Sequence, residues 1–272
     1  MQRVGEHSLP RGPLAPRWLA WSLDDPRAGV LGHARVVLEN AGTATWRSRG
    51  ADGVQVAYHW LDPLGNPIVW DGIRTALPHP VAPGETVELD LPVLSPRPPG
   101  PYRLAFDLIE EHRFWFAEIG CEPLDTPVEV APRIAERRLG VLVHGGPDTE
   151  TTEALAAQDE PVVAAGAVAT AHLVAGCVPA PDWSRRLLDA HEEGWSAVGG
   201  AIDTGGKPGR LAPWQPGGGR NPRFGHPLLL PSLLAGLEPS EHEGLPAYDD
   251  GDALFEGRAV VRLPRRSGRR RA

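Results

Sequence analysis

Cysteine is scarce in this chain: Cys121 and Cys177 are the only two among 272 residues. They stand far apart in the sequence, in different predicted domains, and neither belongs to a spaced metal-binding motif. The sequence therefore offers neither a disulfide framework nor a cysteine-based metal site. Cysteine usage of this kind indicates a reducing compartment, so we expect a cytoplasmic protein.

An excess of basic charge is also lacking. The chain carries 27 lysines and arginines against 35 aspartates and glutamates, which gives a net charge of −8 at pH 7. This balance argues against a broad basic face, so we expect no specific nucleic-acid partner. The exception is the arginine-rich tail at 263–272, which we interpret as a solvated, disordered end. Peripheral contact of this tail with phosphate or an acidic membrane surface is the alternative.

Long hydrophobic runs are missing as well. The longest weakly polar run, 162–178, is shorter than the ~20 residues that a membrane span needs. It is rich in alanine and glycine and contains His172, so we expect a buried core segment and no transmembrane span. Residues 1–17 carry prolines and charges where a signal peptide needs an unbroken apolar core, which argues against secretion by that route. They are predicted to form a flexible N-terminus.

The first half of the chain alternates apolar and polar side chains with a period of two. Segments 54–62, 85–94 and 102–116 place their apolar residues on one face, as half-buried strands do. Pro92 within the second segment predicts an edge strand. Several short strands, separated by turn-forming residues and without helical patterns between them, predict an antiparallel β-sandwich over residues 18–125.

A family resemblance supports this assignment. The motif ENAGTATW at 39–46, together with 58–85 and 98–120, resembles the immunoglobulin-like modules that accompany bacterial glycosyltransferases and other surface-polysaccharide enzymes. The resemblance implies an all-β immunoglobulin-like antiparallel sandwich that is itself non-catalytic and works in a glycan-related context. It does not imply a particular ligand.

Aromatic side chains in this half supply flat, amphipathic faces of the kind on which sugar rings stack. They are Trp46, Tyr58, Trp60, Trp70 and Trp115, with Asp62, Asp71 and Arg74 available for sugar hydroxyls. Core packing is the favoured interpretation for each aromatic, because Tyr58 and Trp60 share a face with valines and Trp46 stands at a turn. Core packing is least certain for Trp70 and Trp115, which are therefore the predicted ligand-binding residues of this half.

The pattern changes after a charged, proline-marked linker at 126–137. The apolar run 139–146 ends in glycines, as a buried parallel strand does. A helix with Asp148 or Thr149 at its N-cap is expected to follow. Strand, glycine turn and helix in this order predict a small α/β region over residues 138–262.

A second helix is predicted to begin near Trp183 and to end before Gly194. The stretch WSAVGGAI at 195–202 is expected to form the next strand. The region contains neither a P-loop nor a dinucleotide-binding G-x-G-x-x-G motif.

Residues 176–202 resemble the part of family-two glycosyltransferases that follows their metal-binding Asp-x-Asp strand. In those enzymes the two aspartates ligate a divalent cation that neutralises the diphosphate of a nucleotide sugar. Here Val174 and Gly176 occupy the aspartate positions, and neither can hold a cation. Only residues 159–170 lie where the family needs room for the strands that bind the nucleotide base. The resemblance therefore implies a reduced GT-A region without a metal site, and no cofactor is predicted.

An acidic group follows near the position where those transferases carry their acceptor-side catalytic acid. It contains Asp249, Asp250, Asp252 and Glu256. A base here would deprotonate an attacking hydroxyl, and Asp250 and Asp252 are the catalytic candidates. An ordinary Asp-Gly turn is the favoured interpretation.

A glycine-rich loop offers the other candidate binding site. Residues 217–219 are glycines, and Arg220, Asn221 and Arg223 follow them. Backbone amides and guanidinium groups in this order could wrap an anionic or polyhydroxyl ligand. A rigid irregular loop without a ligand is an equally weighted alternative.

Two functions of different class remain open. The favoured one is a non-catalytic accessory protein of bacterial surface-glycan biosynthesis, which binds saccharide or a partner enzyme of glycan assembly. The alternative is a metal-independent glycosyltransferase that acts on a nucleotide sugar. Val174, Gly176 and the compressed nucleotide region favour the first, because charge neutralisation of a diphosphate is much of what such an enzyme contributes.

Overall fold

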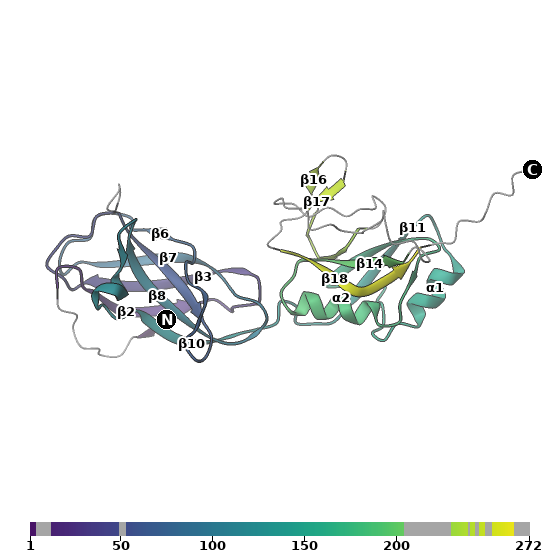
Figure 1. The fold of residues 1–272 in the computed structure, drawn as a ribbon, viewed down its shortest axis with the longest axis horizontal. Coiled ribbons are helices and arrows are strands. Elements are labelled where there is room, and N and C mark those ends of the chain that lie inside the picture. Colours follow the sequence, from purple (N-terminus) through teal and green to yellow (C-terminus); the bar gives the residue numbers. More distant parts are fainter. Residues whose placement is uncertain are drawn as a thin grey trace, which may run out of the picture. The chain divides into compact units, whose positions relative to one another are not determined.

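The computed structural model describes residues 1–3, 12–48, 53–203, 230–238, 240–242, 245–247 and 252–263. The chain forms two compact units, Met1–Pro132 and Arg133–Ala272 (Figure 1). Each unit has a hydrophobic core of its own.

The first unit is an antiparallel β-sandwich. One sheet has the order β1-β2-β3-β7, and its strands pair antiparallel throughout. Pro92 lies in β7 at the edge of this sheet, as the sequence predicts, so its missing N–H removes no hydrogen bond from a central strand. The strands are β1 Gln2–Arg3, β2 Pro16–Leu23, β3 Leu31–Asn40 and β7 Thr86–Leu94.

The second sheet of the sandwich has the order β10-β8-β4-β5, with β6 also pairing β4 and β9 also pairing β8. A 3-10 helix, η1 Phe116–Ile119, follows β9. The strands are β4 Val54–Leu61, β5 Pro67–Val69, β6 Thr75–Ala76, β8 Gly100–Glu110, β9 Phe114–Trp115 and β10 Leu124–Val130. Strand β10 carries the sandwich beyond residue 125, the predicted boundary, because its inward residues continue the period of two into the predicted linker.

The core of the sandwich is built from the inward residues of both sheets. On β4 these are the residues that the alternation predicts, and Tyr58 and Trp60 are almost fully buried. The Leu94 backbone connects both to the other sheet: its N–H donates to the Tyr58 hydroxyl at 2.9 Å, and its carbonyl accepts from Trp60 Nε1 at 3.0 Å. The Tyr102 hydroxyl donates to the Pro98 carbonyl at 2.7 Å, and its ring packs edge-on against Trp60. A buried tryptophan and a tyrosine corner of this kind occur together in immunoglobulin domains.

The second unit contains a mixed six-stranded sheet of order β11-β12-β15-β14-β18-β13. The pairs β11–β12 and β14–β18 are parallel, and the other pairs are antiparallel. Strands β16 Ser240–His242 and β17 Leu245–Ala247 form a separate two-stranded ribbon. The six strands are β11 Leu139–His144, β12 Ala169–Val174, β13 Val178–Pro179, β14 Ala197–Asp203, β15 Ser232–Leu234 and β18 Ala253–Arg262.

Two α-helices belong to the described part of this unit, α1 Thr149–Ala156 and α2 Trp183–Glu192. Asp148 is the N-cap of α1 and accepts a hydrogen bond from the Thr151 N–H at 2.9 Å, one of the two caps that the sequence offered. Figure 1 shows α2 beside β14 and β18. Its buried residues, among them Leu187 and Leu188, join the core formed by the sheet.

The transferase-like fold predicted for this unit is not shown. The chain as a whole is rich in β-strands, and the described part of the second unit has two short helices beside a mixed sheet. Residues 157–168 are the only ones between α1 and β12, which leaves no room for further strand-and-helix units. The run 162–178 is a core segment only in its second half: Ala169, Leu173 and Cys177 are buried, whereas residues 164–166 are exposed.

Neither helix of the described residues is long and apolar enough to cross a bilayer.

Candidate functional site

The outer face of the second sheet of the sandwich carries a cluster of aromatic and charged side chains. His59 on β4 points away from the sandwich core, yet it is only 3% exposed. Two tryptophans cover it: Trp70 from the segment after β5 and Trp115 from β9. We call this cluster the Trp70 platform; it consists of His59, Trp70, Asp71, Arg74, Glu111 and Trp115.

The chain path places Trp70 over the sheet. Strands β5 and β6 both pair with β4, and the residues between them, 70–74, form a bulge in this pairing. Within the bulge the Gly72 N–H donates to the Tyr58 carbonyl at 2.9 Å. A Cβ atom at Gly72 would lie 2.5 Å from the Tyr58 ring, so this close approach requires glycine. The Trp70 carbonyl also accepts a hydrogen bond from His59 Nδ1.

The three rings of the platform contact one another. The His59 ring stacks on Trp70, with ring centroids 4.3 Å apart and planes 21° from parallel. Trp115 meets His59 edge-on at 4.6 Å and Trp70 edge-on at 6.3 Å. Trp70 nevertheless remains 52% exposed, whereas Trp115 is 8% exposed. Trp70 therefore presents a large indole surface to solvent from a fixed position.

Charged groups follow Trp70 in the chain and pair with one another. Arg74 donates two hydrogen bonds to Asp71, at 3.2 and 2.9 Å, and a third to Glu111, which also accepts from the Gln55 amide at 3.1 Å. The hydrogen bonds that Arg74 donates to Asp71, followed by the one it donates to Glu111, raise the pKa of Arg74 above its ordinary value. Burial lowers the pKa of His59, which keeps the stacked imidazole uncharged at neutral pH. The platform thus combines an open apolar surface with preset hydrogen-bonding groups.

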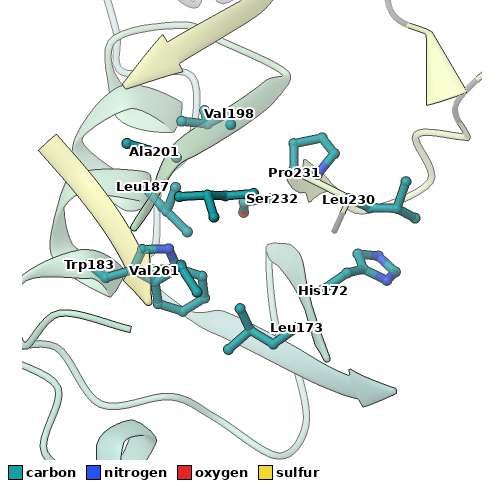
Figure 2. Close-up of a pocket in the computed structure, with 13 residues that line it drawn as sticks. His172, Leu173, Trp183, Leu187, Val198, Ala201, Leu230, Pro231, Ser232 and Val261 are labelled. Atoms are coloured by element: carbon teal, nitrogen blue, oxygen red, sulfur yellow. The ribbon is translucent and has the colours of Figure 1, made fainter. Parts of the chain in front are cut away.

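A small cavity lies in the second unit (Figure 2). Its volume is about 30 Å³, and its lining includes His172, Trp183, Val198 and Ser232. Such a volume holds one or two water molecules and is too small for a sugar ring. The geometry there gives no support for a saccharide or nucleotide site.

Two histidines meet beside this cavity. His144 Nε2 and His172 Nδ1, from the parallel strands β11 and β12, are 3.1 Å apart. The two ring centroids are 5.4 Å apart. This is close to the distance between the two nitrogens plus the distance from each nitrogen to the centre of its own ring. The rings therefore lie end to end, and the two nitrogens share a hydrogen bond. Burial, followed by the charge of His144, lowers the pKa of His172. Among the residues that the structure describes, no group of three metal-ligating side chains occurs.

A buried polar network connects α2 to the sheet. His191 Nδ1 lies 2.8 Å from the Trp195 carbonyl, which can only accept, so this nitrogen carries the proton. His191 Nε2 consequently accepts from the Ser232 hydroxyl, also at 2.8 Å. Burial lowers the pKa of His191 to about 4. Each polar atom of this ring has its partner, so its role is to hold α2 against β15.

The acidic residues predicted near the C-terminal end have structural partners where they are described. Asp252 accepts hydrogen bonds from Arg133, the closest at 2.6 Å, and its carbonyl accepts from the Ser196 hydroxyl at 2.8 Å. Glu256 accepts from Arg258, which lowers the pKa of its carboxyl group. The candidates Asp249, Asp250, Arg220, Asn221 and Arg223 lie outside the described residues.

Val174 and Gly176, the positions that the glycosyltransferase resemblance aligns with metal ligands, lie where β12 leads into a turn. Val174 ends β12, and Gly176 has a φ of 83°, a conformation that favours glycine. The Gly176 N–H donates to the Thr151 hydroxyl at 2.9 Å, and this hydroxyl donates to the Cys177 carbonyl at 2.9 Å. The turn after β12 is thereby fixed to α1.

The structure brings the predicted ligand-binding residues Trp70 and Trp115 together in one cluster, although it does not test whether they bind a ligand. Sequence analysis had also offered Asp71 and Arg74 for hydroxyl contacts. It missed His59 and Glu111. The signal for His59 was its outward position on an alternating strand, where a histidine flanked by exposed aromatics would be a candidate for stacking.

Comparisons with known proteins add little. No protein-family model matches the chain, and no curated protein matches it. Among solved structures, the C-terminal domain of Wzt matches with a TM-score of 0.29 and 10% sequence identity, over 44% of this chain and 74% of that one. A putative beta-galactosidase from Bacteroides fragilis matches with a TM-score of 0.24 and 11% identity, over 66% of this chain and 28% of that one. Both TM-scores are too low to support a shared function.

Proposed function

We propose that the N-terminal immunoglobulin-like sandwich is a saccharide-binding module that holds a sugar ring on the Trp70 platform. The observation that carries this proposal is the half-exposed indole of Trp70, which is fixed in place by His59 beneath it and by the Gly72 bulge. A pyranose ring has an apolar C–H face that can cover such an indole and polar hydroxyls at its rim. Asp71 directly follows Trp70 in the chain and pairs with Arg74, and we infer that these two side chains would meet the hydroxyls.

The fixed position of Trp70 favours binding. A ligand site gains affinity when its groups are already ordered, because less conformational freedom is lost on association. Here the stacked imidazole, the Gly72 bulge and the hydrogen bonds of Arg74 order the platform before any ligand arrives. A single open platform of this kind is expected to bind weakly, with dissociation constants near the millimolar range, which corresponds to about −4 kcal/mol.

The proposed context is non-catalytic work in bacterial surface-glycan assembly, with a transferase-like second unit that has lost its donor site. The resemblance of residues 176–202 to family-two glycosyltransferases motivates this context, and strand β12 and helix α2 lie on either side of its first residues. Gly176, at a lost ligand position, serves to pack α1. We infer that this unit contributes folding stability or a partner surface and leaves saccharide binding to the sandwich.

The test is a binding titration with a panel of uncharged oligosaccharides, followed by calorimetry or by the NMR signals of the tryptophan indoles. Trp70→Ala should weaken binding at least about fivefold, because a central aromatic contact commonly contributes more than about 1 kcal/mol. Ile68→Ala is the matched control, since Ile68 is 48% exposed on the same hairpin and lies outside the platform. Equal losses in the two variants, or binding that survives without Trp70, would contradict the proposal. Binding of a nucleotide sugar that is insensitive to Trp70 would support the transferase alternative in its place.

A further inference from the structure

The charges around Trp70 are unequal in number. The carboxylates of Asp71 and Glu111 both pair with the one guanidinium of Arg74. Burial lowers the pKa of His59, so the imidazole adds no positive charge near neutral pH. Glu111 also lies 3.4 Å from the exposed imidazole of His112, so the platform carries one net negative charge where both histidines are neutral.

The arrangement of these charges decides which of them a ligand meets. Asp71 is the most open of the three, with 53% of its side chain exposed, whereas Arg74 is 29% and Glu111 18% exposed. Arg74 has its donors directed at the two carboxylates and lies partly over Trp115, with its guanidinium carbon 6.0 Å from that ring centroid. Asp71, which is exposed and directly follows Trp70 in the chain, is consequently the charge that a ligand on the indole would meet first.

We propose that the platform selects uncharged glycans against acidic ones, with Asp71 and Glu111 as its specificity-determining residues; this inference rests on the proposed saccharide-binding function. The sugar hydroxyls can donate hydrogen bonds to the exposed oxygen atoms of Asp71. A uronate carboxylate or a sugar phosphate brings a second negative charge to the same place. It cannot displace the Asp71 side chain from Arg74 without breaking a two-point hydrogen bond.

The size of the discrimination follows from Coulomb's law. One unit charge at roughly 7 Å from another in water changes the binding constant about threefold, and more where the ligand excludes solvent. Salt weakens this repulsion, since the Debye length falls from about 10 Å at 0.1 M to about 3 Å at 1 M. The selectivity should therefore be largest at low ionic strength.

The experiment compares matched pairs of oligosaccharides that differ only in a uronate group, titrated into the full chain at 20 mM and at 1 M NaCl. We expect the uronate form to bind at least about threefold more weakly at low salt, and the difference to shrink at high salt. Asp71→Asn should remove most of the difference, and Glu111→Gln should reduce it. Glu88→Gln is the matched control, because Glu88 is an exposed carboxylate on β7, in the other sheet, and it pairs with Arg35.

The outcomes separate the two proposals. If the two forms of the sugar bind equally, or if the uronate form binds more tightly, while both depend on Trp70, the charge selectivity is refuted and saccharide binding stands. The uncharged form could also be preferred in a salt-sensitive way that Glu88→Gln removes and Asp71→Asn leaves intact. That result would refute the assignment of the selectivity to Asp71. If neither form binds at any salt concentration, the proposed function itself fails, and the selectivity with it.

Discussion

Acidification should destabilise the second unit through His191. This side chain is fully buried, and its two ring nitrogens are occupied by the Trp195 carbonyl and the Ser232 hydroxyl in the neutral state. Burial lowers its pKa from 6.5 to about 4. Between these two values the unfolded chain binds more protons than the folded one, so stability falls as pH falls. The stabilisation is complete above pH 6.5 and is lost as the pH approaches 4.

The magnitude follows from the difference between the two pKa values. At 1.36 kcal/mol per pH unit, a pKa lowered from 6.5 to about 4 corresponds to about 3 kcal/mol in total. About 2 kcal/mol of this is lost by pH 5, which would raise the unfolded population of the unit roughly thirtyfold. A loss of this size is a large part of the stability of an ordinary domain.

Native-state hydrogen exchange in urea can measure the second unit by itself, through peptides from α2 and β14. The protein should lose about 2 kcal/mol more between pH 7 and pH 5 than the His191→Gln variant, whose amide cannot titrate in this range. His144→Gln is the matched control, because His144 is an exposed histidine of the same unit and its removal should leave the contribution of His191 in place. An identical pH dependence in the protein and in His191→Gln, or greater stability at pH 5 than at pH 7 in these peptides, would refute the reasoning.

Three further predictions concern other named contacts. Burial raises the pKa of Asp107 to about 6, so the folded sandwich binds more protons than the unfolded chain between pH 3.8 and 6 and loses stability as the pH rises through that range. Asp107→Asn should flatten this pH dependence in thermal unfolding of the sandwich. An unchanged pH profile in the variant would contradict the prediction. Tyr102→Phe removes the hydrogen bond to the Pro98 carbonyl and should cost about 1 kcal/mol in urea unfolding of the sandwich, whereas no loss would mean that the corner contributes only its ring. Asp148→Ala removes the N-cap of α1 and should cost about 1 kcal/mol, seen as faster exchange of the α1 amides, while Asp148→Asn should recover most of it.

Local pattern was enough to predict much of the fold. The period of two on β4 predicted that Tyr58 and Trp60 are buried, because successive side chains of a strand point to opposite faces. The N-cap at Asp148 and the end of α2 before Gly194 were also predictable from neighbouring residues, since capping interactions act within one turn of helix. Prediction of a transferase-like fold went further than the structure shows, because similarity in a short segment does not specify how many strands a sheet contains.

The sequence by itself determined the strands β4, β7 and β8 with their buried faces and the helices α1 and α2, because these properties depend on neighbours a few positions away. Only the tertiary structure decided that His59, an outward residue, is buried, since its cover comes from Trp70 and Trp115 elsewhere in the chain. The tertiary structure also decided the ion pair between Arg74 and Glu111, because Glu111 directly follows β8 and is distant from Arg74 in the sequence. Such contacts depend on which strands pair and where a bulge interrupts the pairing, and no local periodicity encodes that choice.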